Sequence, residues 1–259
     1  MRVTFLWRPI GLLLAAAFSC IGQLDVPRIG YLAEPGGALR PLAGIGGNFL
    51  LGEPVAHEVR AAVFAGRFGL VHASDRLVLV GPSLEPLASL SGLSEQALLA
   101  VSSALPLGVA WLPERGELCR LGPYRDASPN CFPLSVDGAV RAAGVTSEES
   151  AVLAVERNRA LWLMLVDLEK RRTVREMHLA GIAPPVALLG EDILFCLDGE
   201  LVVRRADGSE IRSPSPVAAP EFEPVGRGWV SLRDAAGARW IVRVSEERLE
   251  VFCLAGGAL

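Results

Sequence analysis

The sequence has only one lysine and three histidines among its 259 residues, and it lacks the short motifs that usually mark an enzyme. It has no G-x-S-x-G segment, which a serine nucleophile on a tight turn requires. It also has no H-E-x-x-H segment and no C-x-x-C pair, which are typical of zinc sites. The histidines, His57, His72 and His178, are far apart along the chain. These absences argue against an enzyme and predict no metal site and no cofactor.

Basic residues are fewer than acidic ones, with 25 lysine and arginine residues against 29 aspartate and glutamate residues and a formal net charge of −4. Nucleic-acid-binding proteins usually present a basic surface that neutralises phosphates, so the composition argues against a nucleic-acid partner. Apolar residues make up 51% of the chain. A chain of this length and composition can bury a substantial core, and we therefore expect a folded protein.

The first 22 residues have the pattern of an export signal. Arg2 and Arg8 provide a positively charged start, and residues 17–19 offer small side chains at a cleavage site. The apolar core between them, Ile10–Phe18, is shorter than the roughly 20 residues that a membrane-spanning helix needs. We therefore predict an exported protein, periplasmic or extracellular, with no transmembrane segment in its mature chain.

The five cysteines are interpreted in the light of export. Cys20 follows a segment that resembles a bacterial lipobox, and this alternative predicts a lipid anchor on Cys20 in place of simple secretion. Thiols outside the cytoplasm can pair. Cys119 and Cys131 fall on consecutive predicted strands, where a cross-strand disulfide is geometrically reasonable. Cys196 and Cys253 lie inside apolar runs, and we interpret them as small buried side chains.

A strand pattern recurs along the chain with a period of about 40 residues. In each repeat a short apolar run follows a tight turn, and successive runs begin 40, 43, 42 and 35 residues apart. The five runs are Phe68–Ala73, Gly108–Leu112, Ala151–Val155, Ile193–Leu197 and Gly228–Leu232. Strand repeats of this period are typical of propeller blades. The sequence therefore predicts an all-β fold, a β-propeller of about five to six four-stranded blades, as a single domain over residues 28–254.

Turn residues separate the strands within each repeat. In the fourth repeat the separators include Asp198-Gly199 and Asp207-Gly208, and Asp-Gly is a strong hairpin signal because primed turns need positive φ at both central positions. The third repeat contains the run Leu161–Leu168, which has helix-forming neighbours but lacks the 3.6-residue spacing of an amphipathic helix. We predict that this run is a strand.

Ahead of the first full repeat, Arg28–Leu32 and Ala38–Leu42 predict a further hairpin. We expect this hairpin to match the third and fourth strands of a blade, with the glycine-rich residues 44–47 as the connection to the next blade. Two arrangements remain open: five blades with an extra hairpin, or six blades with one incomplete. Completing a ring removes exposed strand edges, which would otherwise template aggregation.

The repeats resemble those of exported bacterial β-propeller proteins of the YVTN-type and TolB-like group. The resemblance covers residues 28–254 and rests on strand rhythm and the export signal, because the tryptophan-aspartate dipeptide, the YVTN tetrapeptide and the tryptophan-docking motif are absent. It implies the fold and a bias toward binding or scaffolding at the cell envelope. It carries no functional residues over to this chain.

Ligands of propellers usually bind at the mouth of the central channel, where loops and inner-strand ends converge. The first strand of each repeat is rich in small residues, so we place it against the channel. Polar residues that flank these strands form the predicted binding site: Glu58, Arg60, Gln96, Arg141, Glu221 and Glu223.

The leading functional hypothesis is a non-enzymatic interaction or scaffold module at the cell envelope, with another protein as its partner. A small-ligand sensor is one alternative. A propeller hydrolase, lactonase-like or glycan-cleaving, is another, and it requires carboxylates or histidines from several blades to meet in the channel. The candidates for such a cluster are His57, Glu58, Glu148, Glu149, Asp192 and Glu223.

Overall fold

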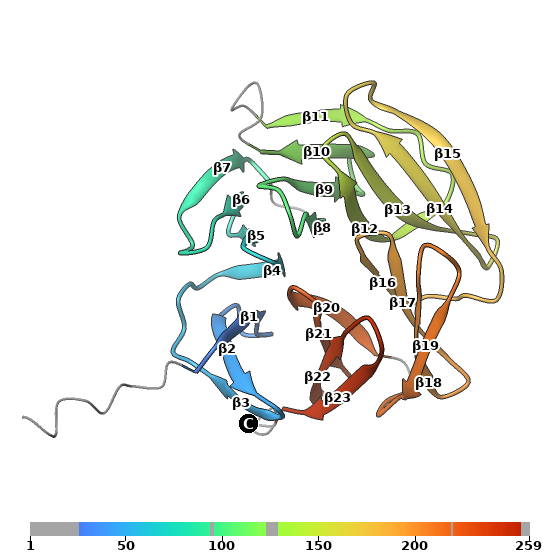
Figure 1. Cartoon of the computed structure of the whole chain (residues 1–259). Coiled ribbons are helices and arrows are strands. Elements are labelled where there is room, and N and C mark those ends of the chain that lie inside the picture. The colour runs from blue at the N-terminus through green and yellow to red at the C-terminus, as the bar shows by residue number, and fades with distance from the viewer. Residues whose placement is uncertain (1–25, 94–95, 123–128, 219, 255–259) are drawn as a thin grey trace, which may run out of the picture.

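The computed structural model describes residues 26–93, 96–122, 129–218 and 220–254. These residues form 23 strands in six antiparallel sheets, which are arranged as blades around a central axis (Figure 1). The predicted all-β propeller is confirmed, and the number of blades is six. No helix capable of crossing a membrane occurs within the described ranges.

We name the blades A to F in chain order. Blade A has three strands, and each of the others has four, written here from the axis outward. The strands are β1 (Arg28–Ala33), β2 (Leu39–Ile45) and β3 (Asn48–Leu51) in blade A; β4 (Val59–Ala65), β5 (Phe68–Ala73), β6 (Arg76–Val80) and β7 (Pro86–Ser91) in blade B; β8 (Leu98–Val101), β9 (Gly108–Leu112), β10 (Glu117–Leu121) and β11 (Asn130–Pro133) in blade C; β12 (Ala139–Ser147), β13 (Ser150–Arg157), β14 (Ala160–Asp167) and β15 (Arg172–Leu179) in blade D; β16 (Val186–Leu189), β17 (Asp192–Leu197), β18 (Glu200–Arg204) and β19 (Glu210–Pro214) in blade E; and β20 (Glu221–Gly226), β21 (Trp229–Arg233), β22 (Arg239–Val244) and β23 (Leu249–Cys253) in blade F.

The turns follow the chemistry of their residues. Asp198 and Gly199 both have positive φ, at 51° and 81°, as expected for the primed turn between β17 and β18. At the turn between β18 and β19 only Gly208 is left-handed, with φ at 88°. The second Asp-Gly pair therefore forms a different turn from the predicted one. The run predicted as a strand in the third repeat is β14, so that prediction is confirmed.

Blade A differs from the predicted hairpin in two ways. It contains a third strand, β3, and residues 44–47 form the end of β2 and the Gly46-Gly47 turn to β3 instead of a connection to blade B. Its strands also occupy the second, third and fourth positions of a blade. Gly30 of β1 lies beside Val225, and the Ala33 amide reaches Glu223, so β1 runs antiparallel to the inner strand β20. Blade A therefore has no innermost strand of its own.

The ring closes around this gap. The inner strands β4 and β20 pack directly against each other, and blade A lies behind their junction with β1 against both (Figure 1). The rings of Tyr31 in β1 and Phe64 in β4 have centroids 4.7 Å apart. Five strands thus surround the axis of a six-bladed propeller, and the first and last blades meet without exchanging strands.

The hydrophobic core is divided into clusters between neighbouring blades. The largest one joins blades C and D and includes Trp111, Leu153 and Met164. A smaller cluster, with Leu32, Leu42 and Val225, fills the junction between blades A and F. Burying such side chains contributes about 1.5–3 kcal/mol each. The ring is therefore held together mainly by lateral packing between sheets.

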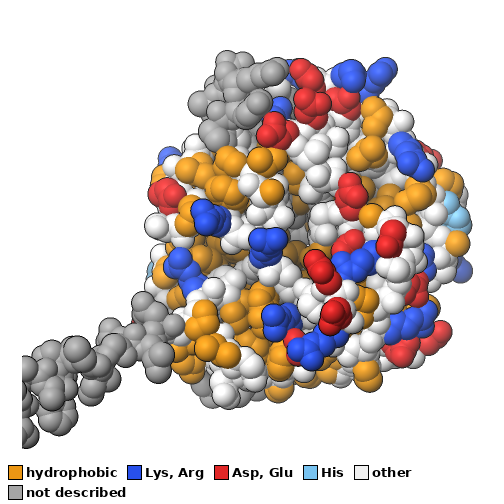
Figure 2. Space-filling view, viewed as in Figure 1, with side chains coloured by type: hydrophobic (Ala, Val, Ile, Leu, Met, Phe, Trp, Pro, Cys, Tyr) orange, Lys and Arg blue, Asp and Glu red, His pale blue; other side chains and the backbone are white. Residues whose placement is uncertain are grey.

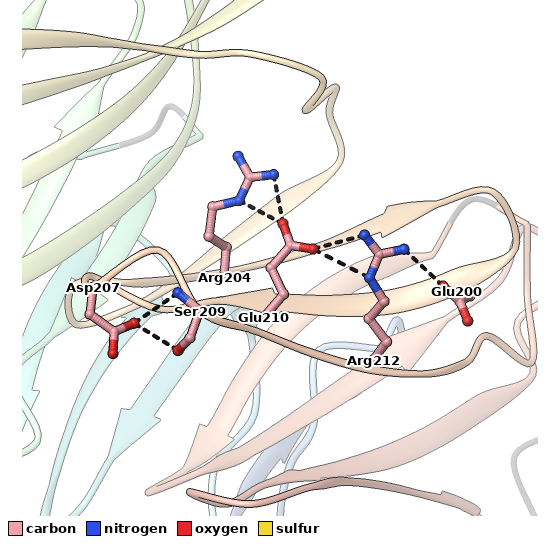
Figure 3. Close-up of polar contacts among 6 residues, drawn as sticks. All are labelled: Glu200, Arg204, Asp207, Ser209, Glu210 and Arg212. Atoms are coloured by element: carbon pink, nitrogen blue, oxygen red, sulfur yellow. Dashed lines mark hydrogen bonds and ion pairs between the residues drawn. The ribbon is translucent and has the colours of Figure 1, made fainter.

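The outer hairpin of blade E carries a row of alternating charges (Figure 3). Glu210 lies between Arg204 and Arg212, at 2.7 and 2.8 Å, and Arg212 also pairs with Glu200 at 3.1 Å. Hydrogen bonds from Arg212 and Arg204 lower the pKa of Glu210. These ion pairs are partly exposed and contribute little stability each. Their charges line the outer strand, where they disfavour pairing with another chain.

A disulfide joins Cys119 and Cys131, which lie directly opposite each other on β10 and β11. Cys196 is half-buried, with its Sγ 3.7 Å from Ser215 Oγ, and burial raises the pKa of its thiol. Cys253 is exposed. The interpretation of Cys253 as a buried side chain was wrong, because it lies on β23, the outermost strand of the last blade.

Replacing both Cys119 and Cys131 with alanine is expected to lower the free energy of unfolding by about 3 kcal/mol, because the disulfide restricts the unfolded chain. The cross-linked residues are 12 positions apart. Urea unfolding of the oxidised protein and the double variant measures the difference. Cys253→Ala is the control and should change the free energy by less than about 0.5 kcal/mol. Equal stability of the oxidised protein and the double variant would contradict the prediction.

Candidate binding site at the upper mouth of the channel

A channel runs along the propeller axis between the inner strands of blades B to F. These strands all begin at one end, which we call the upper mouth, and finish at the other, the lower mouth. An upper cavity of about 750 Å³ and a lower cavity of about 560 Å³ meet between them. Each inner strand contributes one residue that lines both cavities: Val63, Leu99, Ala143, Leu188 and Pro224.

Small side chains keep the upper cavity open. Ala61 and Ala62 of β4, Ala142 of β12 and Ala187 of β16 all line it. This agrees with the small residues of the predicted inner strands, because bulky side chains from five converging strands would fill the axis. Blade A contributes the end of β1 and the turn that follows it, through Ala33, Glu34 and Pro35.

The structure brings together most of the residues proposed from the sequence. Five of the six line the upper cavity: Arg60, Gln96, Arg141, Glu221 and Glu223. Glu58 does not line it. Glu58 is exposed, and its backbone is left-handed, with φ at 57°. Its carboxylate accepts a hydrogen bond from the hydroxyl group of Ser74 in blade B. Glu58 is therefore a turn residue next to the first inner strand, and its assignment to the channel mouth was wrong.

Charged side chains at the upper mouth are engaged with neighbours. Arg233 pairs with Glu221 across β20 and β21, through a bond from its Nε at 2.9 Å. Arg141 pairs with Glu156 across β12 and β13 at 2.7 Å. Figure 2, viewed along the propeller axis, shows both signs interspersed over the face that it draws. The mouth thus offers a mixed polar rim and no broad field of one sign.

Four further residues of the cavity were missed by the sequence analysis. Glu34 lies in the turn of blade A, and the others belong to the second and third strands of blade F: Ser231, Arg233 and Arg239. The repeat pattern points only to residues beside the first strand of each repeat. Because blade A has no inner strand, the neighbouring strands of blade F reach the cavity wall, and no local pattern signals this.

Arg239 and Glu223 hold the end of β1 between them. Arg239 Nη2 donates to the Ala33 carbonyl oxygen at 2.9 Å, and the Ala33 amide donates to Glu223 Oε1 at 3.2 Å. Arg239 is buried, with 6% of its surface exposed. These two bonds engage both backbone polar groups of one residue, Ala33. They fasten blade A to blade F beside the upper cavity.

Burial also changes the acidity of this pair. It raises the pKa of Glu223 to about 7, although the charge of Arg239 and the Ala33 amide act in the opposite direction. It lowers the pKa of Arg239, which nevertheless stays protonated because guanidinium groups do not lose their proton in proteins. A carboxyl group that titrates near neutral pH in a cavity wall is a frequent feature of functional sites.

The histidines are not part of this site. His72 is fully buried in blade B, with its Nε2 3.1 Å from the Leu93 carbonyl oxygen. His178 packs on the Trp162 ring in blade D, with centroids 5.0 Å apart. Within the described ranges, no group of three or more His, Cys, Asp or Glu residues could hold a metal ion. Of the residues that a hydrolase cluster required, Glu223 is the one that lines the upper cavity.

No family model matches the sequence, and neither does any curated protein. Solved structures do resemble the fold. A chain in the crystal structure of a nidogen/laminin complex aligns with a TM-score of 0.59 at 7% identity, over 88% of this chain and 93% of that chain. The WD40 domain of Toxoplasma gondii coronin aligns with a TM-score of 0.52 at 12% identity, over 88% and 67%. At these identities the similarity shows the β-propeller fold alone.

Proposed function

We propose that this protein is an exported, non-enzymatic β-propeller that binds a partner protein at the upper mouth, as an interaction or scaffold module at the cell envelope. The upper mouth carries the proposal. Four blades contribute polar side chains to one open cavity there, through Arg60, Gln96, Arg141 and Glu221. A mixed polar rim around a cavity suits recognition of another surface.

Export is supported by two features of the chain. The first 22 residues have the pattern of a signal peptide, and residues 28–254 resemble exported bacterial propellers in their strand rhythm. The disulfide between Cys119 and Cys131 also favours an oxidising compartment, because disulfides persist there and are rare in the cytosol. Cys20 is the candidate for a lipid anchor at the membrane.

A small ligand in the upper cavity is the second candidate function. Glu223 and Arg239 favour this function, because these two polar residues lie in the cavity wall, beneath the rim where a folded partner would rest. A volume of about 750 Å³ lies within the range of small-molecule sites, about 300–1,000 Å³. The two functions are compatible, since a partner can also insert a side chain into the cavity.

The test is a crosslinking pull-down of the tagged protein from its native cells, with mass spectrometry that also identifies the mature N-terminus. We expect one dominant, stoichiometric partner. Arg141→Glu reverses a charge at the upper mouth, and we expect it to reduce capture of that partner at least about tenfold, by like-charge repulsion. A mature chain starting with lipidated Cys20 would add membrane anchoring.

Arg227→Glu is the matched control. Arg227 is an exposed arginine that lines the lower cavity, so the same charge reversal there should leave capture unchanged. Equal loss with both variants, or capture that neither variant affects, would place the partner elsewhere than at the upper mouth. Recovery of the protein alone would overturn the scaffold proposal and leave the small-ligand function as the better one.

A further inference from the structure

The wall of the upper cavity contains a compact polar pocket formed by blade F. Its members are Glu223 on β20, Ser231 on β21 and Arg239 on β22, and all three line the cavity. Glu223 and Ser231 are direct cross-strand partners. Ser231 is 1% exposed and Arg239 is 6% exposed. Three hydrogen-bonding side chains on three adjacent strands thus lie in a wall that is otherwise lined largely by small apolar residues.

The guanidinium group of Arg239 has a hydrogen-bond donor that is not used within the described part of the chain. Nη2 is occupied by the Ala33 carbonyl oxygen, but Nη1 has no hydrogen-bond partner among the described residues. Leaving a buried, charged donor without an acceptor is destabilising. Three other buried side-chain nitrogens among the described residues also lack a hydrogen-bond partner, but Arg239 is the one of these four residues that lines the upper cavity. An acceptor that enters from the cavity would remove this destabilisation.

The positive charge of Arg239 also lacks a close counter-ion. Glu223 is the carboxyl group that acts on it most strongly, yet no hydrogen bond or ion pair joins the two side chains within the described part of the chain. Because burial raises the pKa of Glu223 to about 7, the carboxyl is neutral about half of the time at pH 7. In that state the buried guanidinium keeps only the weaker influence of the Glu34 and Glu221 carboxylates.

We propose that this pocket binds a carboxylate group, which accepts hydrogen bonds from Arg239 and Ser231 and lies beside the side chain of Glu223. A carboxylate matches the planar donor arrangement of a guanidinium. Its single negative charge suits a pocket that also faces acidic side chains, whereas the dianionic form of phosphate, which prevails above about pH 7, is repelled more strongly. Arg239 lines the cavity, but Nη1 itself is buried in the wall, so the proposal requires the guanidinium to turn toward the cavity when the carboxylate binds.

The carboxylate can belong to a small acid or to a partner protein that inserts an acidic side chain or its C-terminus. This inference deepens the proposed function, since it names what the upper cavity recognises. It stands independently of whether the partner is a protein, because the chemistry of the pocket is the same for both sources.

Binding is coupled to protonation of Glu223. A bound anion raises the pKa of Glu223 further, so at pH 8 the protein takes up about one proton for each carboxylate bound, and at pH 6 almost none. The affinity therefore falls as the pH rises, by about tenfold between pH 6 and pH 8. The charged and polar groups that face Glu223 are Glu221 on its own strand, Arg233 and Arg239 on the next two strands, and the Ala33 amide with Glu34 from blade A.

Titration calorimetry with acetate, succinate and benzoate tests the proposal at pH 6 and pH 8 in chloride buffers. Each pH is measured in two buffers of different ionisation enthalpy, which reports the proton uptake. We expect the wild-type affinity to fall about tenfold from pH 6 to pH 8. In Glu223→Gln the affinity should change by less than about twofold between pH 6 and pH 8. Glutamine is neutral at both pH values, and its side-chain oxygen still accepts a hydrogen bond from the Ala33 amide.

Ser231→Ala should weaken binding about tenfold without lowering the melting temperature, since it removes one hydrogen bond to a charged group. Arg227→Gln, at the lower mouth, is the matched control and should leave binding unchanged. Substitutions of Arg239 are less suitable, because Arg239 also holds blade A. At pH 8, where inorganic phosphate is mainly a dianion, it should bind at least about tenfold more weakly than the monoanions acetate and benzoate at the same concentration.

Two peptides of the same sequence distinguish a partner protein from a small acid as the source of the carboxylate. One peptide has a free C-terminal carboxylate, and the other has an amidated C-terminus. Tighter binding of the free peptide than of acetate supports a protein source, and preference for the small acids supports a metabolite. No heat with any carboxylate at 20 mM, equal binding of phosphate and acetate at pH 8, or an unchanged pH dependence in Glu223→Gln would each overturn the proposal. Failure of the pull-down alone would leave this inference intact, so the two failures are distinguishable.

Discussion

Replacing Gly30 with alanine is expected to lower the free energy of unfolding by at least about 3 kcal/mol, the largest effect that we predict for a single methyl group in this protein. A Cβ at this position would lie 1.5 Å from the Val225 carbonyl oxygen and 2.6 Å from its carbon. Both neighbours are backbone atoms, so no side-chain rotation relieves the clash. The strands β1 and β20 would have to separate, which opens the junction between the first and last blades.

Gly226→Ala tests the same contact from the other side, because its Cβ would lie 2.1 Å from the Ile29 carbonyl oxygen. Since both substitutions break one contact, the double variant should lose less stability than the sum of the two single losses. Gly36→Ala is the control. Its added Cβ meets no atom within 4 Å, and its expected effect is below about 0.5 kcal/mol.

Urea unfolding measures these differences, and hydrogen exchange locates them. In Gly30→Ala we expect amide protection to fall first in blades A and F, while blades C and D, on the far side of the ring, keep theirs. A loss below about 1 kcal/mol, or a uniform loss of protection over all blades, would be inconsistent with a ring that closes through the approach of β1 to β20.

The second large effect concerns pH. The folded protein is expected to become less stable as the pH rises from about 4.5 to above 7, through Glu223. Burial raises the pKa of Glu223 to about 7 in the folded protein, from an ordinary value of 4.5 that also applies to the unfolded chain. Folding therefore favours the protonated form. The stability that this form provides is fully present below pH 4.5 and is lost as the pH passes 7, with an upper limit of about 3 kcal/mol. Contact with water in the cavity reduces this value.

Glu223→Gln isolates this contribution. Other acidic groups with lowered pKa values, such as Asp167, Glu176 and Glu210, act in the opposite direction below their ordinary pKa, but they are the same in both proteins and cancel in the comparison. From pH 5.5 to pH 8, the free energy of unfolding of the wild type should fall about 1–3 kcal/mol further than that of the variant. Parallel pH profiles for the two proteins would show that Glu223 ionises freely in the fold.

The close contact of Gly30 with β20 and the burial of Glu223 share a structural cause. Blade A has three strands and no inner one, so it depends on neighbours at both ends of β1. Near the lower mouth, the backbone of Gly30 approaches Gly226, and near the upper mouth, Arg239 and Glu223 hold Ala33. The same arrangement places a buried charge in the cavity wall. Ring closure and the proposed carboxylate pocket are therefore parts of one junction.

Much of the blade structure could be predicted from the sequence. Residues 193–197 predicted β17 within one residue of its start, and Asp198-Gly199 marked the turn to β18, because a short apolar run and a turn conformation depend on a few neighbouring residues. Five of the six proposed cavity residues also line one cavity, since they flank strands that the repeat pattern places at the axis. Whether they bind a partner stays a prediction.

The sequence by itself determined the all-β repeat, because hairpins form between adjacent segments and their signals are local. It could not determine the position of blade A or the wall of the cavity. The contact between Ala33 and Glu223 joins residues 190 positions apart, and that between Arg239 and Ala33 spans 206. Only the tertiary structure decided these, because the direction of β1 and the burial of Arg239 depend on how the first and last blades pack together.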